Sequence, residues 1–269
     1  MDAAHEIFRT PFAVTPTLAP IDVPDNYRRY REGADLPAKI PGWRVHDDLP
    51  SRDVGLVSDP YGFTDSPDCE FIASGINSKG PRSVALGRQG NFFLWGFCAP
   101  PASLTDEAER VFLNTLVYMK RFDRQRPLHE KVRRAREWLV QYAFLLKDQE
   151  ASDYLIARID KDLLADRDGM LARVERELDY VWCDGDVFWI GADCRELGIP
   201  NGDPRLLDAC AEALERDAND ARATRLLRRY VGQDLGAAAA WREWIGTNRA
   251  RLYFSDTAGY RWFVAPAGR

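Results

Sequence analysis

A histidine followed by two carboxylates is the clearest place in the sequence where acid–base chemistry could occur. His46 directly precedes Asp47 and Asp48, and Asp68 follows in the same acid-rich stretch. A neighbouring carboxylate can orient an imidazole and stabilise its charged form, which suits a general base. These four residues are our candidate catalytic groups. The alternative is that His46 is simply an exposed residue at the end of a strand.

The acid-rich stretch could also hold a hard cation, because Ca²⁺ and Mg²⁺ bind through carboxylate oxygens. Its acids do not follow the alternating spacing around a central glycine that marks a calcium-binding loop, and Asp-Pro and Ser-Pro-Asp sequences also form turns. The three histidines lack zinc-ligand spacing, and no phosphate-binding or dinucleotide-binding glycine motif is present. We therefore expect neither a metal nor a cofactor.

Cys98 lies between an apolar segment and a helix, where an α/β enzyme could place a nucleophile. Its surroundings, Gly96-Phe97-Cys98-Ala99-Pro100, lack the small residues that let the chain turn sharply at a nucleophile elbow. Pro100 and Pro101 also remove backbone N–H donors that an oxyanion hole would need. A buried thiol fits Cys98 better, and the sequence contains no complete catalytic motif.

Composition narrows the class of protein. The chain has 269 residues, 45% of them hydrophobic and 29% charged, which is typical of a soluble globular protein. The net charge of −5 gives nucleic acid no global attraction, and no apolar run approaches the roughly 20 residues of a membrane helix. The acidic N-terminus resembles no secretory signal, so we expect a cytoplasmic protein that binds neither nucleic acid nor membrane.

The character of the sequence changes near residue 124, which predicts an α+β protein with regions at 1–124 and 125–269. The first region is rich in proline, glycine and short apolar segments. Residues 83–86 and 91–95 flank a predicted hairpin turn, and the second strand should be buried on both faces because it is continuously apolar. Ser103 or Thr105 should cap a helix whose inner face carries Ala108, Phe112, Leu116 and Met119.

The second region is predicted to be helical almost to its end. A helix should begin at Pro127, since apolar residues then alternate spacings of four and three at Leu128, Val132, Ala135, Leu139, Tyr142 and Leu146. A further stripe runs from Leu171 to Val181, and a helix pair covers 204–231. After a tryptophan-rich helix, the segments 252–254 and 260–264 predict a terminal hairpin or a strand-like lid over the helices.

Three stretches together resemble the last strands and closing helix of a known domain. They are Asp68 to Gly80, Ser83 to Phe97 and Leu104 to Phe122, preceded by His5-Glu6-Ile7-Phe8. The combination is similar to the second half of a ThuA-like domain of the class I glutamine amidotransferase-like superfamily, over about residues 5–123. The resemblance implies an incomplete α/β sheet without a nucleophile elbow, because that elbow belongs to the first half of the domain.

The C-terminal region has its own resemblance. The segments 232–236, 241–244 and 248–254, with the helix pair before them, are similar to modules that end HEAT-like repeats in large bacterial proteins. Such helical stacks usually bind partners. Trp241, Trp244 and Trp262 are candidate binding anchors, because tryptophan is enriched among the residues that dominate interfaces. The alternative is that these rings fill the core.

These observations favour a non-catalytic binding or scaffold protein. The missing half-sheet would leave an apolar edge, which a longer product, the helical tail, a protein partner or a second copy could cover. The alternative is a carbohydrate-related enzyme or sugar-binding protein, in which the acidic loops of the first region bind a small polar ligand. That alternative requires His46 to meet at least two of the candidate carboxylates in one pocket.

Overall fold

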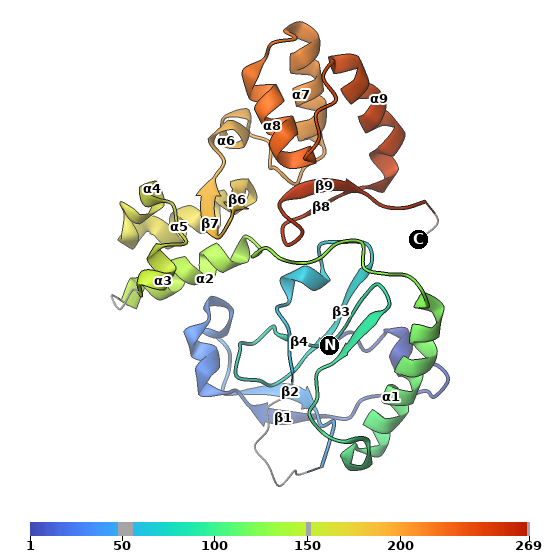
Figure 1. The fold of residues 1–269 in the computed structure, drawn as a ribbon. Coiled ribbons are helices and arrows are strands. Elements are labelled where there is room, and N and C mark those ends of the chain that lie inside the picture. Colours follow the sequence, from blue (N-terminus) through green and yellow to red (C-terminus); the bar gives the residue numbers. More distant parts are fainter. Residues whose placement is uncertain (48–55, 149–151, 268–269) are drawn as a thin grey trace. The chain divides into compact units, whose positions relative to one another are not determined.

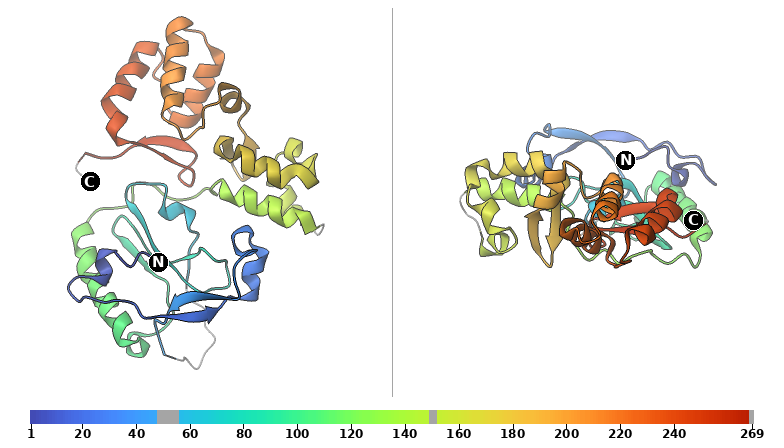
Figure 2. Two further views of the ribbon diagram at one scale, coloured as in Figure 1. Left: turned by 180° about the vertical axis from the view of Figure 1, so that it is seen from behind. Right: turned by 90° about the horizontal axis from the view of Figure 1, so that it is seen from above.

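The computed structural model describes residues 1–47, 56–148 and 152–267 and shows a mixed α+β protein. Its chain forms two compact units (Figures 1 and 2). The first unit comprises Met1–Thr64 and Asp68–Leu128, and the second comprises Asp65–Pro67 and His129–Arg269. The change of unit thus falls four residues after the predicted position, and the segment around Asp65 belongs to the second unit.

The described part of the first unit contains two small antiparallel sheets. β1 (Leu18–Asp22) pairs with β2 (Lys39–Trp43), and the second sheet has the order β3 (Cys69–Ser74), β4 (Val84–Gln89) and β5 (Phe92–Trp95). The predicted hairpin is therefore present, and Gly90 turns it with a φ of 55°. Burial of β5 on both faces was a wrong prediction, because β5 is an edge strand and Phe92 is exposed.

A long helix packs on the β3–β5 sheet. α1 (Asp106–Met119) begins at Thr105, whose Oγ1 accepts the Ala108 N–H at 3.3 Å. The predicted inner face was wrong, because Leu116 is exposed. The helix instead buries a neighbouring stripe that includes an asparagine: Ala108, Val111, Asn114, Thr115 and Tyr118.

Buried Asn114 explains why the inner face of α1 is rotated from the purely apolar stripe. Its Nδ2 donates to the carbonyl oxygens of Ile7 at 2.8 Å and Phe12 at 2.7 Å. Its Oδ1 accepts the Phe12 N–H at 2.9 Å. These bonds hold the N-terminal segment against α1, where Ile7 and Phe8 join the core with Ile72 and Leu86. The described residues of this unit also form short 3₁₀ helices at Glu6–Phe8, Asp25–Arg29, Arg31–Gly33, Tyr61–Phe63, Pro101–Ser103 and Lys120–Phe122.

The helix predicted from Pro127 begins only at Glu137, and the segment before it is irregular. α2 covers only Glu137–Leu145, and Val132 of the predicted seam is exposed. The Arg133 N–H donates to the Thr257 carbonyl at 2.9 Å, so the backbone here pairs with the C-terminal loop and not with its own preceding turn. The seam is buried only from Ala135 onward.

The remaining helices of the described second unit are α3 (Asp153–Ile156), α4 (Lys161–Leu164), α5 (Arg167–Glu177), α6 (Ala192–Leu197), α7 (Arg205–Arg216), α8 (Ala221–Val231) and α9 (Ala238–Asn248). Short 3₁₀ turns occupy Leu146–Asp148, Leu178–Tyr180 and Arg249–Arg251. The predicted helix pair is confirmed as α7 and α8. Gly232 ends α8 with a φ of 73°, in the left-handed region that glycine tolerates.

In the described second unit, two hairpins accompany these helices. β8 (Leu252–Ser255) and β9 (Arg261–Val264) form the predicted terminal hairpin. β6 (Val181–Asp184) and β7 (Val187–Ile190) form one that the helical prediction missed, so the region is not all-helical. Its turn, Asp184-Gly185-Asp186, carries a typical hairpin sequence, and Gly185 has a φ of 58°. Within the described residues, no helix is long and apolar enough to cross a membrane.

Candidate functional site

His46 and Asp47 lie in the first unit just after β2. His46 forms an isolated antiparallel bridge with Leu104, and its Nδ1 lies 2.8 Å from the carbonyl oxygen of Asp47. The Asp47 carboxylate is largely exposed and lies 3.9 Å from Arg44. Asp48, the third member of this candidate group, lies outside the described residues. Among the described residues, the imidazole Nδ1 of His46 thus contacts a backbone oxygen.

Asp68 occupies a different setting at the start of β3. It is buried, and its Oδ2 accepts the N–H of Leu128 at 2.8 Å, while its own carbonyl accepts the N–H of Gly90 at 2.9 Å. Asp68 thus joins the β4–β5 turn and the last residue of the first unit. The Asp68 carboxylate therefore stabilises the local structure through this hydrogen bond.

A cluster of coupled ionisable groups that the sequence did not predict surrounds Glu70 in the first unit. Glu70 on β3 lies opposite Arg88 on β4. Arg88 donates from Nε and Nη2 to the two carboxylate oxygens at 2.9 and 3.0 Å. Tyr118 of α1 donates its hydroxyl to Glu70 Oε2, and His5 Nε2 lies 3.5 Å from the same oxygen. The predicted hairpin joins 83–86 to 91–95 and places Arg88 in its turn, so it gave no signal for this pair across β3 and β4.

The electrostatics of this cluster fix its protonation states. Burial alone would raise the pKa of Glu70, but hydrogen bonds from His5, Arg88 and Tyr118 hold that pKa well below its usual range. Burial and the bond to Glu70 raise the pKa of Tyr118 to about 12. At neutral pH Glu70 is therefore ionised and Tyr118 protonated. A carboxylate with three donors is a poor proton acceptor, so the cluster is suited to holding β3, β4 and α1 together.

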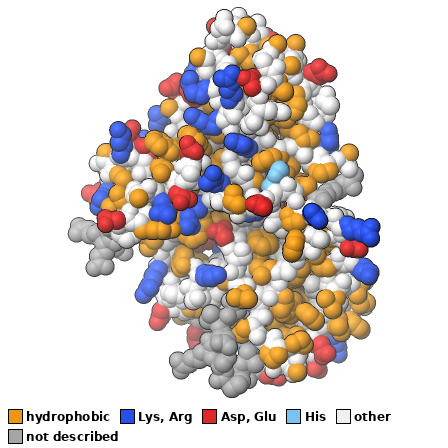
Figure 3. Space-filling model, viewed as in Figure 1, with side chains coloured by type: hydrophobic (Ala, Val, Ile, Leu, Met, Phe, Trp, Pro, Cys, Tyr) orange, Lys and Arg blue, Asp and Glu red, His pale blue; other side chains and the backbone are white. Residues whose placement is uncertain are grey.

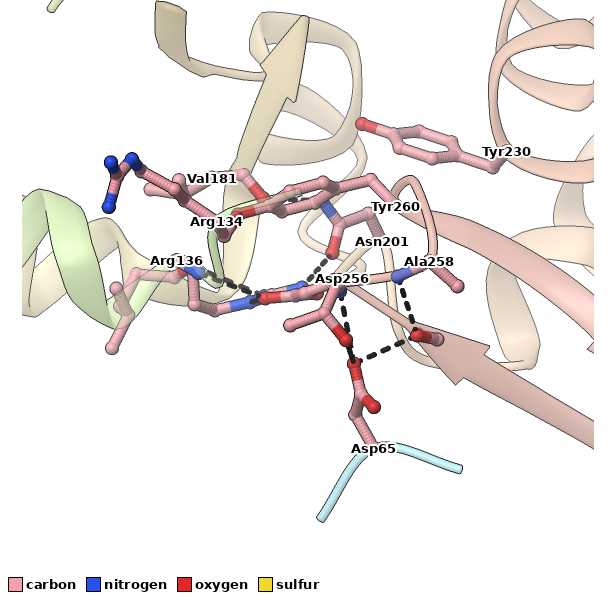
Figure 4. A network of polar contacts seen from close by, with 12 residues as sticks. Asp65, Arg134, Arg136, Val181, Asn201, Tyr230, Asp256, Ala258 and Tyr260 are labelled. Atoms are coloured by element: carbon pink, nitrogen blue, oxygen red, sulfur yellow. Dashed lines mark hydrogen bonds and ion pairs between the residues drawn. The ribbon is translucent and has the colours of Figure 1, made fainter. Parts of the chain in front are cut away.

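The second unit contains a larger buried network, shown in Figure 4. Arg136 donates from Nη2 and Nε to the two carboxylate oxygens of Asp256 at 2.7 and 2.8 Å, and from Nη2 to Asn201 Oδ1 at 2.9 Å. Tyr260 donates its hydroxyl to the Arg134 carbonyl at 2.9 Å. Burial raises the pKa of Tyr260, and Asp256 raises that of Arg136 against the effect of burial. Each of these side chains thus forms a hydrogen bond with another group of the protein.

Asp65 brings a lysine and a serine together next to this network. Its Oδ2 accepts hydrogen bonds from Ser255 Oγ at 2.8 Å and Thr257 Oγ1 at 2.7 Å, while Lys131 forms an ion pair with Oδ1. Lys131 Nζ also lies 3.3 Å from Ser255 Oγ, which superficially resembles a serine–lysine catalytic pair. Ser255 is fully buried and the ammonium is bound to Asp65, so this geometry stabilises the loop after β8.

Two of the three candidate anchor tryptophans lie in the core. Trp241 is 2% exposed and Trp262 is 5% exposed, with the Trp262 indole N–H donating to the Asn201 carbonyl at 3.1 Å. Trp244 is partly buried against the same core and meets Trp241 edge to face at 6.2 Å. For Trp241 or Trp262 to anchor a partner, the ring would have to leave the packing of α7, α8 and α9.

Three of the cysteines are buried thiols. Burial raises the pKa of Cys183 and Cys194 to about 11 and that of Cys210 to about 12, which favours the unreactive thiol. Cys98 is partly buried and forms no disulfide. Within the described parts of the chain, no group of three histidine, cysteine or acidic side chains could hold a metal ion.

The outer face of α1 differs from these closed clusters because its apolar side chains are open. Leu113 is 40% exposed, Leu116 56% and Val117 54%. A shallow hollow lies beside them, lined by Leu116, Val117, Lys120 and Arg121. Figure 3 shows hydrophobic side chains gathered over this part of the first unit. We call Leu113, Leu116 and Val117, with Glu109 and Lys120 at either end, the outer row of α1.

Comparisons with known proteins add no family assignment. The chain matches no family model, no curated protein and no solved structure. The resemblances to a ThuA-like domain and to HEAT-like modules therefore rest on the residues that suggest them.

Proposed function

We propose that the protein is a non-catalytic binding protein and that the outer row of α1 is its contact surface for another protein. The observation that carries this proposal is the exposure of Leu113, Leu116 and Val117 side by side on one helix. Contiguous exposed apolar side chains with polar neighbours are typical of protein-interaction sites. Scattered single apolar residues would need no such explanation.

The helix that carries the outer row is firmly held, which suits a contact surface. Asn114 and Thr115 are buried on the opposite side, Tyr118 is bonded to Glu70, and Phe112 packs edge to face on Trp95 at 5.1 Å. A surface whose backbone is already fixed loses little conformational entropy on binding. The exposed apolar atoms would supply the favourable free energy, and the charged ends would supply orientation.

We also propose that the first unit is a partial ThuA-like region and that the second contains a HEAT-like module. The sheet β3–β5 followed by α1 supports a partial ThuA-like region, and the packed pair α7 and α8 supports a HEAT-like module. The free cysteines of the described chain agree with a reducing compartment such as the cytoplasm. The carbohydrate alternative has less support, because Asp68 is engaged with Leu128 and the rings of Trp241 and Trp262 are buried.

Site-specific photo-crosslinking tests the proposal in the cell of origin. A photoreactive phenylalanine analogue at position 116 should give protein adducts that depend on Leu113, so that Leu113→Glu removes them. The matched control carries the same analogue at Val132, which is 66% exposed but belongs to the second unit. Adducts at position 116 no more abundant than those at position 132 would show that the outer row is not a contact surface.

A further inference from the structure

We infer that the partner of the outer row is a second copy of this chain, bound with its α1 antiparallel to the first. This inference rests on the proposed function, since it names the occupant of the same surface. It follows from the spacing of charge and apolar residues along the row, which is self-complementary in the antiparallel orientation.

The spacing is symmetric about one point of the helix. Glu109 lies four residues before Leu113, and Lys120 lies four residues after Leu116. A two-fold axis between Leu113 and Leu116 therefore sets each Leu113 against Leu116 of the second copy. The same axis sets each Glu109 against the other copy's Lys120. The same two-fold rotation thus pairs apolar with apolar residues and acidic with basic residues, as an interface between identical chains requires.

The charged ends of the row are available for this contact. Glu109 and Lys120 are both exposed. At helical spacing they lie on the same side as Leu113 and Leu116. A parallel arrangement would instead bring Glu109 against Glu109 and Lys120 against Lys120, so charge selects the antiparallel orientation.

The helix dipole favours the same orientation. Asp106, Glu107 and Glu109 occupy the first turn of α1, while Lys120 and Arg121 follow its last residue. In an antiparallel pair, the acidic side chains at the start of one helix lie beside the basic side chains at the end of the other. The positive end of each backbone dipole then also lies beside the negative end of its neighbour. A single helix pair is smaller than the standard interface of about 1,600 Å², so we expect reversible dimers at micromolar or higher concentration.

Sedimentation equilibrium of the full chain over a range of concentrations tests this inference. Wild-type protein should pass from monomer to dimer, and Leu116→Glu should stay monomeric. Val132→Glu, which adds the same charge at an exposed apolar residue of the second unit, should dimerise like wild type. A wild type that remains monomeric at the highest attainable concentration, or dimers that Leu116→Glu leaves intact, would overturn the inference.

Charge exchange tests the orientation. Glu109→Lys and Lys120→Glu should each weaken dimerisation about tenfold, because each creates two symmetric like-charge contacts. The double variant Glu109→Lys/Lys120→Glu should recover the wild-type constant to within about threefold. Antiparallel pairing would be contradicted if both single variants dimerise more weakly and the double variant does not recover the wild-type dimerisation constant. Circular dichroism must show that all three variants are folded.

The two proposals can fail separately. Position-116 adducts to a different protein, with a strictly monomeric purified chain, would overturn self-association and leave the proposed contact surface in place. If position 116 yields no specific adduct and the chain is monomeric, both proposals are wrong.

Discussion

Arg136 and Asp256 form a bidentate ion pair inside the second unit, with donor–acceptor distances of 2.7 and 2.8 Å. The two side chains are only 13% and 11% exposed. Asn201 completes the environment by accepting a further bond from Arg136 and donating to the Val181 carbonyl at 2.8 Å. The pair thereby connects the start of α2, the turn after β8 and the start of β6.

Removing one partner of this pair should destabilise the protein strongly. Asp256→Ala leaves the Arg136 guanidinium buried without its counter-ion, so we expect a loss of about 3–5 kcal/mol in the free energy of unfolding. Urea unfolding followed by circular dichroism measures the change. The matched control is Glu196→Gln, which breaks an exposed pair with Arg222 and should change the free energy by less than about 0.5 kcal/mol. Equal effects of both variants would contradict the account.

The Glu70 cluster should make stability depend on acidic pH. The native pKa of Glu70 is lowered from an ordinary value of about 4.5, so the native state resists protonation more than the unfolded state does. Its contribution is therefore complete above about pH 5 and is lost as pH falls from there toward the native pKa. Unfolding of wild type and Glu70→Gln should be compared between pH 7 and pH 2 by chemical denaturation.

At pH 7, Glu70→Gln should cost about 2 kcal/mol, because Arg88 loses its counter-ion while the amide retains some hydrogen bonding. The difference in the free energy of unfolding between wild type and Glu70→Gln should narrow as the pH falls below about 5. If that difference stays constant down to pH 2, the pKa of Glu70 is not lowered in the native protein.

Asn114 should be essential for holding the N-terminal segment. Asn114→Leu keeps a similar volume but removes three hydrogen bonds to Ile7 and Phe12, which should cost about 2–4 kcal/mol. Amide hydrogen exchange should rise most at Phe12, whose N–H loses its acceptor. Arg110→Ala, an exposed change on the same helix, serves as the control and should leave Phe12 protected. Unchanged exchange at Phe12 in Asn114→Leu would refute this role.

The buried thiols should be inert in the native protein. Cys183, Cys194 and Cys210 have pKa values raised by burial, so a thiol-directed reagent at pH 8 should leave them unmodified until the protein unfolds. The partly buried Cys69 and Cys98 should react first. Mass spectrometry of briefly labelled, digested protein identifies the sites. Early labelling of Cys210 in folded protein would contradict the assigned packing.

The elements best predicted from sequence are those that local signals specify. α7 and α8 have regular apolar stripes, and Gly232 marks the end of α8. The hairpins β4–β5 and β8–β9 have turn sequences between apolar segments. In these places the periodicity and the turn chemistry agree, so little depends on distant parts of the chain.

The errors occur where distant contacts decide the structure. The segment before α2 has a helical pattern, but its Arg133 N–H bonds to Thr257 far along the chain. α1 turns a stripe containing Asn114 inward because that amide satisfies the backbone at Ile7 and Phe12. The same rotation exposes Leu116, so the outer row could not be found from apolar periodicity, which assumes that the apolar stripe is the buried one.

The contact surface itself can be observed most directly by methyl NMR. With leucine and valine methyl groups labelled, dilution from the highest attainable concentration to the low micromolar range should shift the signals of Leu113, Leu116 and Val117. The signal of Val132 should stay in place over the same dilution. Signals of the outer row that do not move, or shifts concentrated at other exposed residues such as Val132, would contradict the account.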